Sequence, residues 1–132
     1  MILNAPIYDV AHETPLDYAP RLSEKLDNRV FIKREDLQPV FSFKIRGAYN
    51  KLINLKKNER DSGVVAASAG NHAQGVALSA SKLNIKATIV MPETTPNIKI
   101  DGVRKFGANV VLFGDDFATA FEKAKVLAAQ HS

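Results

Sequence analysis

Lys44 carries the side chain in this sequence that is best suited to covalent chemistry. It lies within Ser42-Phe43-Lys44-Ile45-Arg46-Gly47-Ala48, where apolar residues flank it and a helix-like pattern continues to Leu55. A lysine amine that is partly removed from water has a lowered pKa, and the neutral amine can form a Schiff base with a carbonyl compound. Most lysines are solvated surface charges. This interpretation therefore needs support from a second segment.

That second segment is Ser68-Ala69-Gly70-Asn71-His72-Ala73-Gln74-Gly75, which lies where a strand should end and a helix should begin. In open parallel sheets ligands bind outside the carboxyl ends of strands, and free amides at a helix start attract anions. A substrate carboxylate fits this position, with Gly70 allowing close backbone approach. The alternative is an ordinary strand-to-helix turn at Gly70 and Asn71, followed by His72 in the first helical turn.

The elements that must position these two segments follow an α/β pattern. Short apolar runs predict strands at 30–33, 64–67, 87–91 and 109–113. Apolar spacing predicts helices at 21–25, 43–54, 72–83, 98–106 and 117–130, and Asp115 and Asp116 are candidate caps for the last of these. Strands that alternate with helices over short connections imply parallel pairing with right-handed crossovers. We therefore expect an α/β fold with three layers, an open parallel sheet carrying helices on both faces.

Composition narrows the classes of partner. The chain has 45% hydrophobic and 24% charged residues, and it contains no apolar run long enough to cross a membrane. With no cysteine it can form neither a disulfide nor a thiolate zinc site. The net charge of +4 comes from basic residues interleaved with acidic ones, which indicates a diffuse basic face. No signal peptide is indicated. We expect a cytoplasmic protein without metal, membrane or nucleic-acid partners.

Several runs of residues resemble a known family, the fold-type II pyridoxal-phosphate enzymes, and within it the threonine dehydratases. The resemblance extends from about Thr14 to the end of the sequence. The form Arg-Glu-Asp-x-Gln-Pro-Val is similar to the biosynthetic threonine dehydratases of isoleucine synthesis. The matching runs are Lys33-Arg34-Glu35-Asp36, Gln38-Pro39-Val40, Ser42-Phe43-Lys44-Ile45-Arg46-Gly47-Ala48-Tyr49, Ser68 to Gly75, and Ile89-Val90-Met91-Pro92.

The resemblance implies a role for each site residue. Lys44 would hold pyridoxal phosphate as an aldimine and later remove the α-proton of the substrate. Phe43, by default a core aromatic, would form a wall beside the pyridine ring. The substrate carboxylate would be held by the loop Ser68, Ala69, Gly70, Asn71 and His72, of which Asn71 would also reach the 3′-oxygen of the cofactor.

The resemblance also implies a reaction. Loss of the β-hydroxyl from L-threonine would give 2-oxobutanoate and ammonia, and L-serine is a related substrate. Serine racemases of this fold carry a second serine where this chain has Ala69, so racemisation is disfavoured. Arg46 is expected to form a structural ion pair, with Glu35 or with Asp36.

Length complicates the functional prediction. Enzymes of this family are longer than 132 residues, and the glycine-rich loop that binds the cofactor phosphate is absent, since the seven glycines are scattered. We expect an N-terminal fragment: a lead-in at 1–29 that packs on a missing large domain, and the small, lysine-bearing domain at 30–132.

Such a fragment would be inactive alone. It would also expose apolar surface around Phe43 and along the first segment, and so form homo-oligomers. Two alternatives are a catabolic-type serine/threonine dehydratase and a non-catalytic interaction module that reuses the fold.

Overall fold

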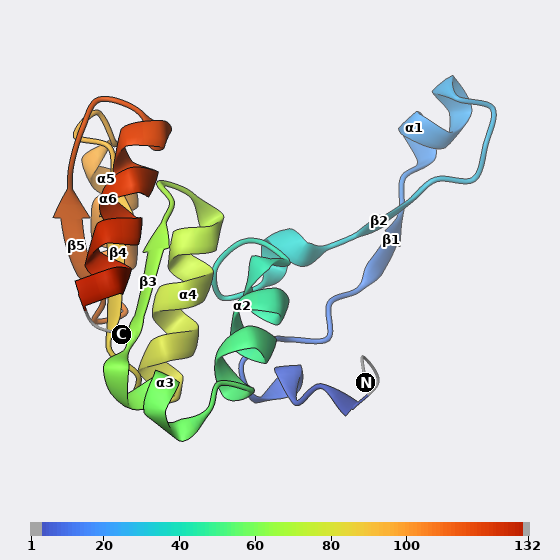
Figure 1. Ribbon diagram of the computed structural model, residues 1–132. Helices are drawn as coiled ribbons and strands as arrows, with labels where there is room; N and C mark the ends of the chain where they lie inside the picture. Colours follow the sequence, from blue (N-terminus) through green and yellow to red (C-terminus); the bar gives the residue numbers. More distant parts are fainter. Residues whose placement is uncertain (1–3, 131–132) are drawn as a thin grey trace.

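The computed structural model describes residues 4–130. Figure 1 shows a compact α/β body and an arm that extends from it. Two short 3₁₀ turns, η2 (Ile7–Asp9) and η3 (Glu35–Leu37), accompany the regular elements. These are β1 (Leu16–Tyr18), α1 (Pro20–Lys25), β2 (Phe31–Lys33), α2 (Lys44–Ile53), α3 (Lys57–Ser62), β3 (Val64–Ala67), α4 (Asn71–Lys82), β4 (Ala87–Met91), α5 (Asn97–Arg104), β5 (Asn109–Leu112) and α6 (Phe117–Gln130).

The body is built on a parallel sheet with strand order β3-β4-β5. Helices α4 and α5 pack on one face of the sheet, and α6 packs on the other (Figure 1). The predicted α/β architecture, a parallel sheet between helical layers, is confirmed. It brings the carboxyl end of β3, where the loop 68–70 begins, to the same edge as the carboxyl end of β4.

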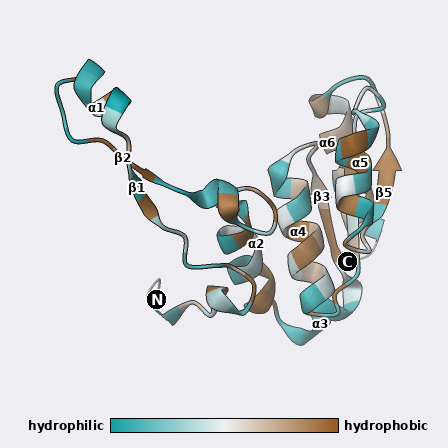
Figure 2. Ribbon diagram, turned by 180° about the vertical axis from the view of Figure 1, so that it is seen from behind, coloured by the Kyte–Doolittle hydropathy of each residue, from teal (hydrophilic) through white to brown (hydrophobic). Residues whose placement is uncertain are grey.

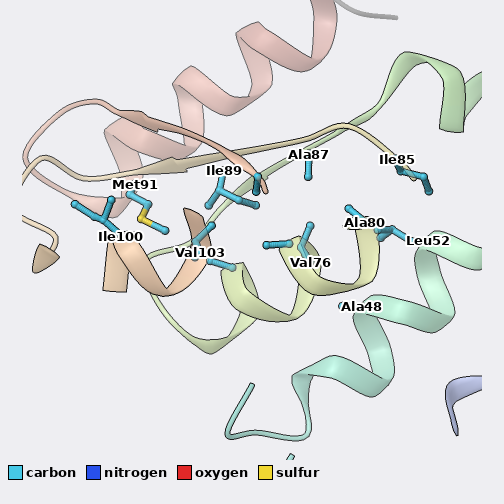
Figure 3. Close-up of a cluster of buried hydrophobic side chains, with 13 residues drawn as sticks. Ala48, Leu52, Val76, Ala80, Ile85, Ala87, Ile89, Met91, Ile100 and Val103 are labelled. Carbon is cyan, nitrogen blue, oxygen red and sulfur yellow. The ribbon is translucent and has the colours of Figure 1, made fainter. Parts of the chain in front are cut away.

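The larger core lies between the sheet, α4 and α2. Ile89 and Met91 of β4 are fully buried and face the layer that contains α4 and α5, with Met91 beside Ile100 of α5 (Figure 3). Helix α4 is rich in small residues because the sheet contacts one of its sides and α2 contacts the other. Val76 and Ala80 of α4 lie between these layers, with Leu52 of α2 beyond them. Helix α2 is thereby fixed against α4.

The opposite face of the sheet is covered by α6. Val90 packs against Ala120 and Ala124, which lie one helical turn apart on the same side of α6. The predicted cap is confirmed for Asp116, whose Oδ1 accepts a hydrogen bond from the Thr119 backbone N–H at 2.8 Å. For Asp115 the structure shows a different contact, in which its backbone carbonyl accepts a bond from the Thr94 hydroxyl.

Parallel pairing is wrong for the predicted strand at 30–33. The observed strand β2 pairs antiparallel with β1, in the register Tyr18 with Phe31, and the two rings lie 5.3 Å apart. Strand β1 was not predicted, because it has three residues and lies between prolines. Helix α3 was also missed. Its polar sequence has no apolar period, and its start depends on the Glu59 carboxylate accepting the Lys56 N–H at 2.6 Å.

The arm formed by β1, α1 and β2 presents apolar side chains to solvent. Figure 2 shows the strands of the arm partly in brown and its helix in teal. The exposed apolar residues include Leu16, Tyr18, Leu26, Phe31 and Ile32. Phe41 and Phe43 are exposed as well, at the start of the body. The predicted exposure of apolar surface around Phe43 and along the first segment is therefore confirmed.

Candidate functional site

Lys44 is the first residue of α2 and its side chain is exposed. Its neighbour Ile45 is fully buried, so the helix start is anchored while Lys44 faces outward. The Lys44 Nζ lies 5.4 Å from the centroid of the Phe43 ring. Phe43 is 60% exposed, so the default reading of it as a core aromatic is wrong. The expected partial removal of the Lys44 amine from water is not observed, because the residue is exposed.

The loop that follows β3 presents free backbone amides. The Ser68 N–H donates to the Val90 carbonyl at 3.1 Å, and the Gly70 N–H donates to Ser68 Oγ at 3.3 Å. Helix α4 then begins at Asn71. Among residues 4–130 the structure provides no hydrogen-bond partner for the backbone N–H groups of Asn71 and His72. Such unpaired donors at the start of a twelve-residue helix suit an anionic group.

The structure brings Lys44 and this loop together, because α2 packs directly on α4. Gly75 of α4 is buried against the backbone of Lys44. Partial burial of the imidazole ring lowers the pKa of His72 below its ordinary value although the residue remains exposed overall, and the positive charge of Lys44 lowers this pKa further. The two side chains are thus within electrostatic reach of each other. Lys44 and the loop 68–72 form one candidate site.

This proximity gives a measurable result for His72. We expect His72 to titrate below 6.5 and its pKa to rise part of the way back in Lys44→Ala, because the charge is removed while the burial remains. NMR titration of the imidazole protons measures both values. Lys82→Ala, at the far end of α4, serves as the control and should leave the pKa of His72 unchanged. Equal values in the chain and in Lys44→Ala would show that the two groups are not close in solution.

An ion pair anchors the first turn of the lysine-bearing helix. Arg46 Nε donates to Glu35 Oε2 at 2.9 Å, and Arg46 Nη2 donates to Glu35 Oε1 at 2.8 Å. The pKa of Glu35 is lowered from its ordinary 4.5 to about 2. The hydrogen bonds from Arg46 are the largest cause, those from Thr14 and Gln38 add to it, and burial opposes it. The predicted structural ion pair of Arg46 is confirmed with Glu35. Asp36 pairs with Arg34 instead.

Gln38 supports the site through a contact that the sequence did not reveal. Its side chain is 1% exposed and bridges both backbone groups of His12, accepting from the N–H at 2.9 Å and donating to the carbonyl at 2.8 Å. Arg46 Nη2 also donates to the His12 carbonyl at 3.0 Å. Two signals in the sequence pointed to this residue: a polar side chain within the apolar run Leu37-Gln38-Pro39-Val40, and the place of Gln38 in a run that carries the family resemblance. These bonds tie the beginning of the chain to α2.

A hollow of about 840 Å³ lies at the amino end of β3, where Lys51, Glu59 and Lys86 are among its lining residues, and it includes none of the candidate site residues. Within the described range, no group of three or more His, Cys, Asp or Glu could hold a metal ion. None of the helices between residues 4 and 130 is long and apolar enough to cross a membrane.

Comparisons with known proteins agree with the geometry. The family model described as "Pyridoxal-phosphate dependent enzyme" matches residues 7–132. Threonine dehydratase 1 biosynthetic, chloroplastic, from Solanum lycopersicum is 60% identical over 124 residues, which are 94% of this chain and 20% of that protein. The L-threonine dehydratase biosynthetic IlvA of Escherichia coli K12 is 51% identical over 129 residues, which are 98% of this chain and 25% of that protein.

Solved structures show the same fold. The processed form of threonine deaminase isoform 2 from Solanum lycopersicum matches with a TM-score of 0.93 and 56% identity, over 98% of this chain and 36% of that one. Maize serine racemase matches with a TM-score of 0.91 and 30% identity, over 98% of this chain and 40% of that one. The chain thus spans about a fifth to a quarter of the curated relatives described above. Because the family model covers nearly all of its residues, the chain belongs to the family of pyridoxal-phosphate-dependent enzymes, with biosynthetic threonine dehydratases among its high-identity relatives.

Proposed function

We propose that this chain supplies the cofactor-binding lysine and the carboxylate-binding loop of a threonine dehydratase, which converts L-threonine to 2-oxobutanoate and ammonia. The observation that carries the proposal is the packing of α2 on α4, which sets Lys44 against the helix that begins with the free amides of Asn71 and His72. The relatives named as biosynthetic threonine dehydratases, which are 51% to 60% identical to this chain, support the choice of substrate. Isoleucine biosynthesis is the corresponding pathway.

The residues present fit pyridoxal phosphate. Lys44 offers an exposed amine at a helix start, and the Phe43 ring beside it is exposed enough to contact the pyridine ring. When bound, the cofactor supplies an electron sink for the negative charge that develops at the substrate α-carbon. Lys44 holds the cofactor, and its freed Nζ then accepts the α-proton of the amino acid. Asn71 is proposed to contact both the cofactor and the substrate.

The loop Ser68, Ala69, Gly70, Asn71 and His72 is proposed to hold the substrate carboxylate. Its free amides and the positive end of the α4 dipole both favour a negative group. The methyl side chain of Ala69 can neither donate nor accept a proton, so the loop offers no second acid or base at that position. This feature favours elimination of the β-hydroxyl over racemisation, even though the fold is shared with a serine racemase.

We further propose that the remaining half of the site lies outside these residues. The scattered glycines offer no phosphate-binding loop. We assign residues 1–29 to a lead-in and 30–132 to the lysine-bearing domain. Val10 and Ala11 of the lead-in already pack on α2, while the apolar arm is free to contact a further domain. Inactivity of the chain alone, assembly into homo-oligomers and a cytoplasmic location stay predictions; the plant relatives carry "chloroplastic" in their names.

A chimera tests the proposed function. This chain replaces the matching segment of the Escherichia coli relative, which is 51% identical to it, and release of 2-oxo acid from L-threonine and L-serine is measured. We expect 2-oxobutanoate from L-threonine. The unaltered relative is the positive control, and the relative lacking the segment is the negative control. A folded chimera that binds pyridoxal phosphate without deaminating L-threonine would contradict the proposal, and turnover of L-serine alone would favour a serine dehydratase.

A further inference from the structure

We propose that Gly75 is a positioning residue for Lys44. The absence of a side chain at position 75 lets α4 approach the peptide that joins Lys44 to Ile45, and this approach sets the distance between the lysine and the carboxylate loop. The inference rests on the proposed function and deepens it, because it names a residue that acts on the site without touching the substrate or the cofactor.

The contact at Gly75 is made to backbone atoms. A Cβ placed on Gly75 would lie 3.3 Å from the Lys44 carbonyl carbon and oxygen, and 3.4 Å from the Ile45 nitrogen. The first two distances are shorter than ordinary van der Waals contacts of a methyl group. A crowded side chain can rotate away, but these backbone atoms belong to the start of α2. Any larger residue at position 75 must therefore move α2 relative to α4.

The geometry of α4 links this contact to the loop. Gly75 lies four residues after Asn71, one helical turn below it and on the same side of the helix. The helix that offers the free amides of Asn71 and His72 therefore also contacts the residue that carries the amine. A shift of α2 against α4 changes the spacing between the two halves of the site. In enzymes a misplacement of about 1 Å can cost about a hundredfold in rate.

Helix propensity does not account for a glycine at this position. A glycine inside a helix costs about 1 kcal/mol relative to alanine, and three other buried positions of α4 are alanines, at Ala73, Ala77 and Ala80. The close approach of α4 to the backbone of Lys44 explains why position 75 is a glycine. Gly47 provides the contrast, because it lies in α2 three residues after Lys44 and a Cβ there would meet nothing within 4 Å.

Paired substitutions at these two glycines test the inference. Gly75→Ala is compared with Gly47→Ala, and Gly75→Val with Gly47→Val. The two members of each comparison change helix propensity by a similar amount, but only the new side chain at position 75 is in steric contact with the backbone of Lys44. Each substitution is made in the chimera, which contains the rest of the proposed site. Each chimera is treated with pyridoxal phosphate and then with borohydride, and peptide mapping gives the ratio of label on Lys44 to label on the exposed Lys57. The backbone amide shifts of Lys44 and Ile45 report the displacement directly.

We expect the labelling ratio to be unchanged at position 47. At position 75 it should fall a few-fold with alanine and about tenfold or more with valine, together with amide shifts at Lys44 and Ile45. Urea unfolding shows whether each variant is folded. If Gly75→Val does not fold, the comparison of Gly75→Ala with Gly47→Ala still tests the inference. Equal ratios at the two positions would overturn the inference, even if Gly75→Val is less stable. Absence of preferential Lys44 labelling in the unsubstituted chimera would also overturn it. Failure of the proposed function is read separately, from turnover by the chimera.

Discussion

Replacing Glu35 by glutamine is expected to lower the free energy of unfolding by about 2 kcal/mol. The substitution leaves the Arg46 guanidinium without its charged partner in a place where the two side chains are only 23% and 15% exposed. It also weakens the hydrogen bond that Glu35 accepts from Thr14 at 2.6 Å. Urea unfolding at neutral pH measures the difference.

The neighbouring carboxylate provides a matched control. Asp36 also pairs with an arginine, Arg34, but this pair is well exposed and neither partner is bonded to α2. Asp36→Asn should therefore change stability much less than Glu35→Gln, because exposed ion pairs contribute little. Equal losses in the two variants would show that the Glu35 network does not anchor the helix.

The contribution of Glu35 should depend on pH in a defined direction. Its pKa is lowered from 4.5 to about 2 in the folded chain, so its stabilisation is fully present above about pH 4.5 and is lost as the pH falls through about 2. The stability difference between the chain and Glu35→Gln should therefore narrow over this interval. Unfolding curves at a series of pH values measure it. A difference that stays constant down to pH 2 would mean that the carboxylate charge is not the stabilising feature.

Replacing Lys44 by alanine in the chimera is expected to reduce deamination of L-threonine by at least about a thousandfold. The substitution removes the amine that is proposed to hold the cofactor and to accept the α-proton. Spectra recorded with pyridoxal phosphate should lose the absorbance band that depends on the covalent adduct. The measurement is the initial rate of 2-oxobutanoate formation, together with the spectrum.

Lys51→Ala is the control for this substitution. Lys51 is also exposed and lies in the same helix, two turns farther on, so its loss changes net charge and helix content in the same way. Turnover should stay within about twofold of the unsubstituted chimera. Comparable activity in Lys44→Ala would show that another group performs the chemistry.

The sequence predicted those parts of the fold that depend on local periodicity. Strands β3 and β4 and helix α4 were placed within a residue or so of their observed bounds. The two strands are short apolar runs, and the apolar residues of the helix follow helical spacing. Strand β1 and helix α3 were not predicted. The first consists of three residues that gain their partner only by pairing with β2, and the second has no apolar period.

The site was predicted less completely than the fold, for a related reason. The two chemical segments at Lys44 and Ser68 to Gly75 were visible as residue types, and the structure places them on helices in contact. The hydrogen bonds between Gln38 and His12 join residues that are 26 positions apart, so no local sequence pattern could predict them. The contact between Gly75 and Lys44 depends on how two helices cross. Such features are set by packing and appear only in three dimensions.

The most direct test of the central claim is to locate the cofactor in the active chimera. After borohydride reduction and trypsin digestion, an adduct on Lys44 blocks cleavage there and yields a labelled peptide that spans residues 35–46. We expect this peptide, with label in proportion to the activity lost on reduction. A chimera that deaminates L-threonine while its label lies on a different lysine would contradict the account.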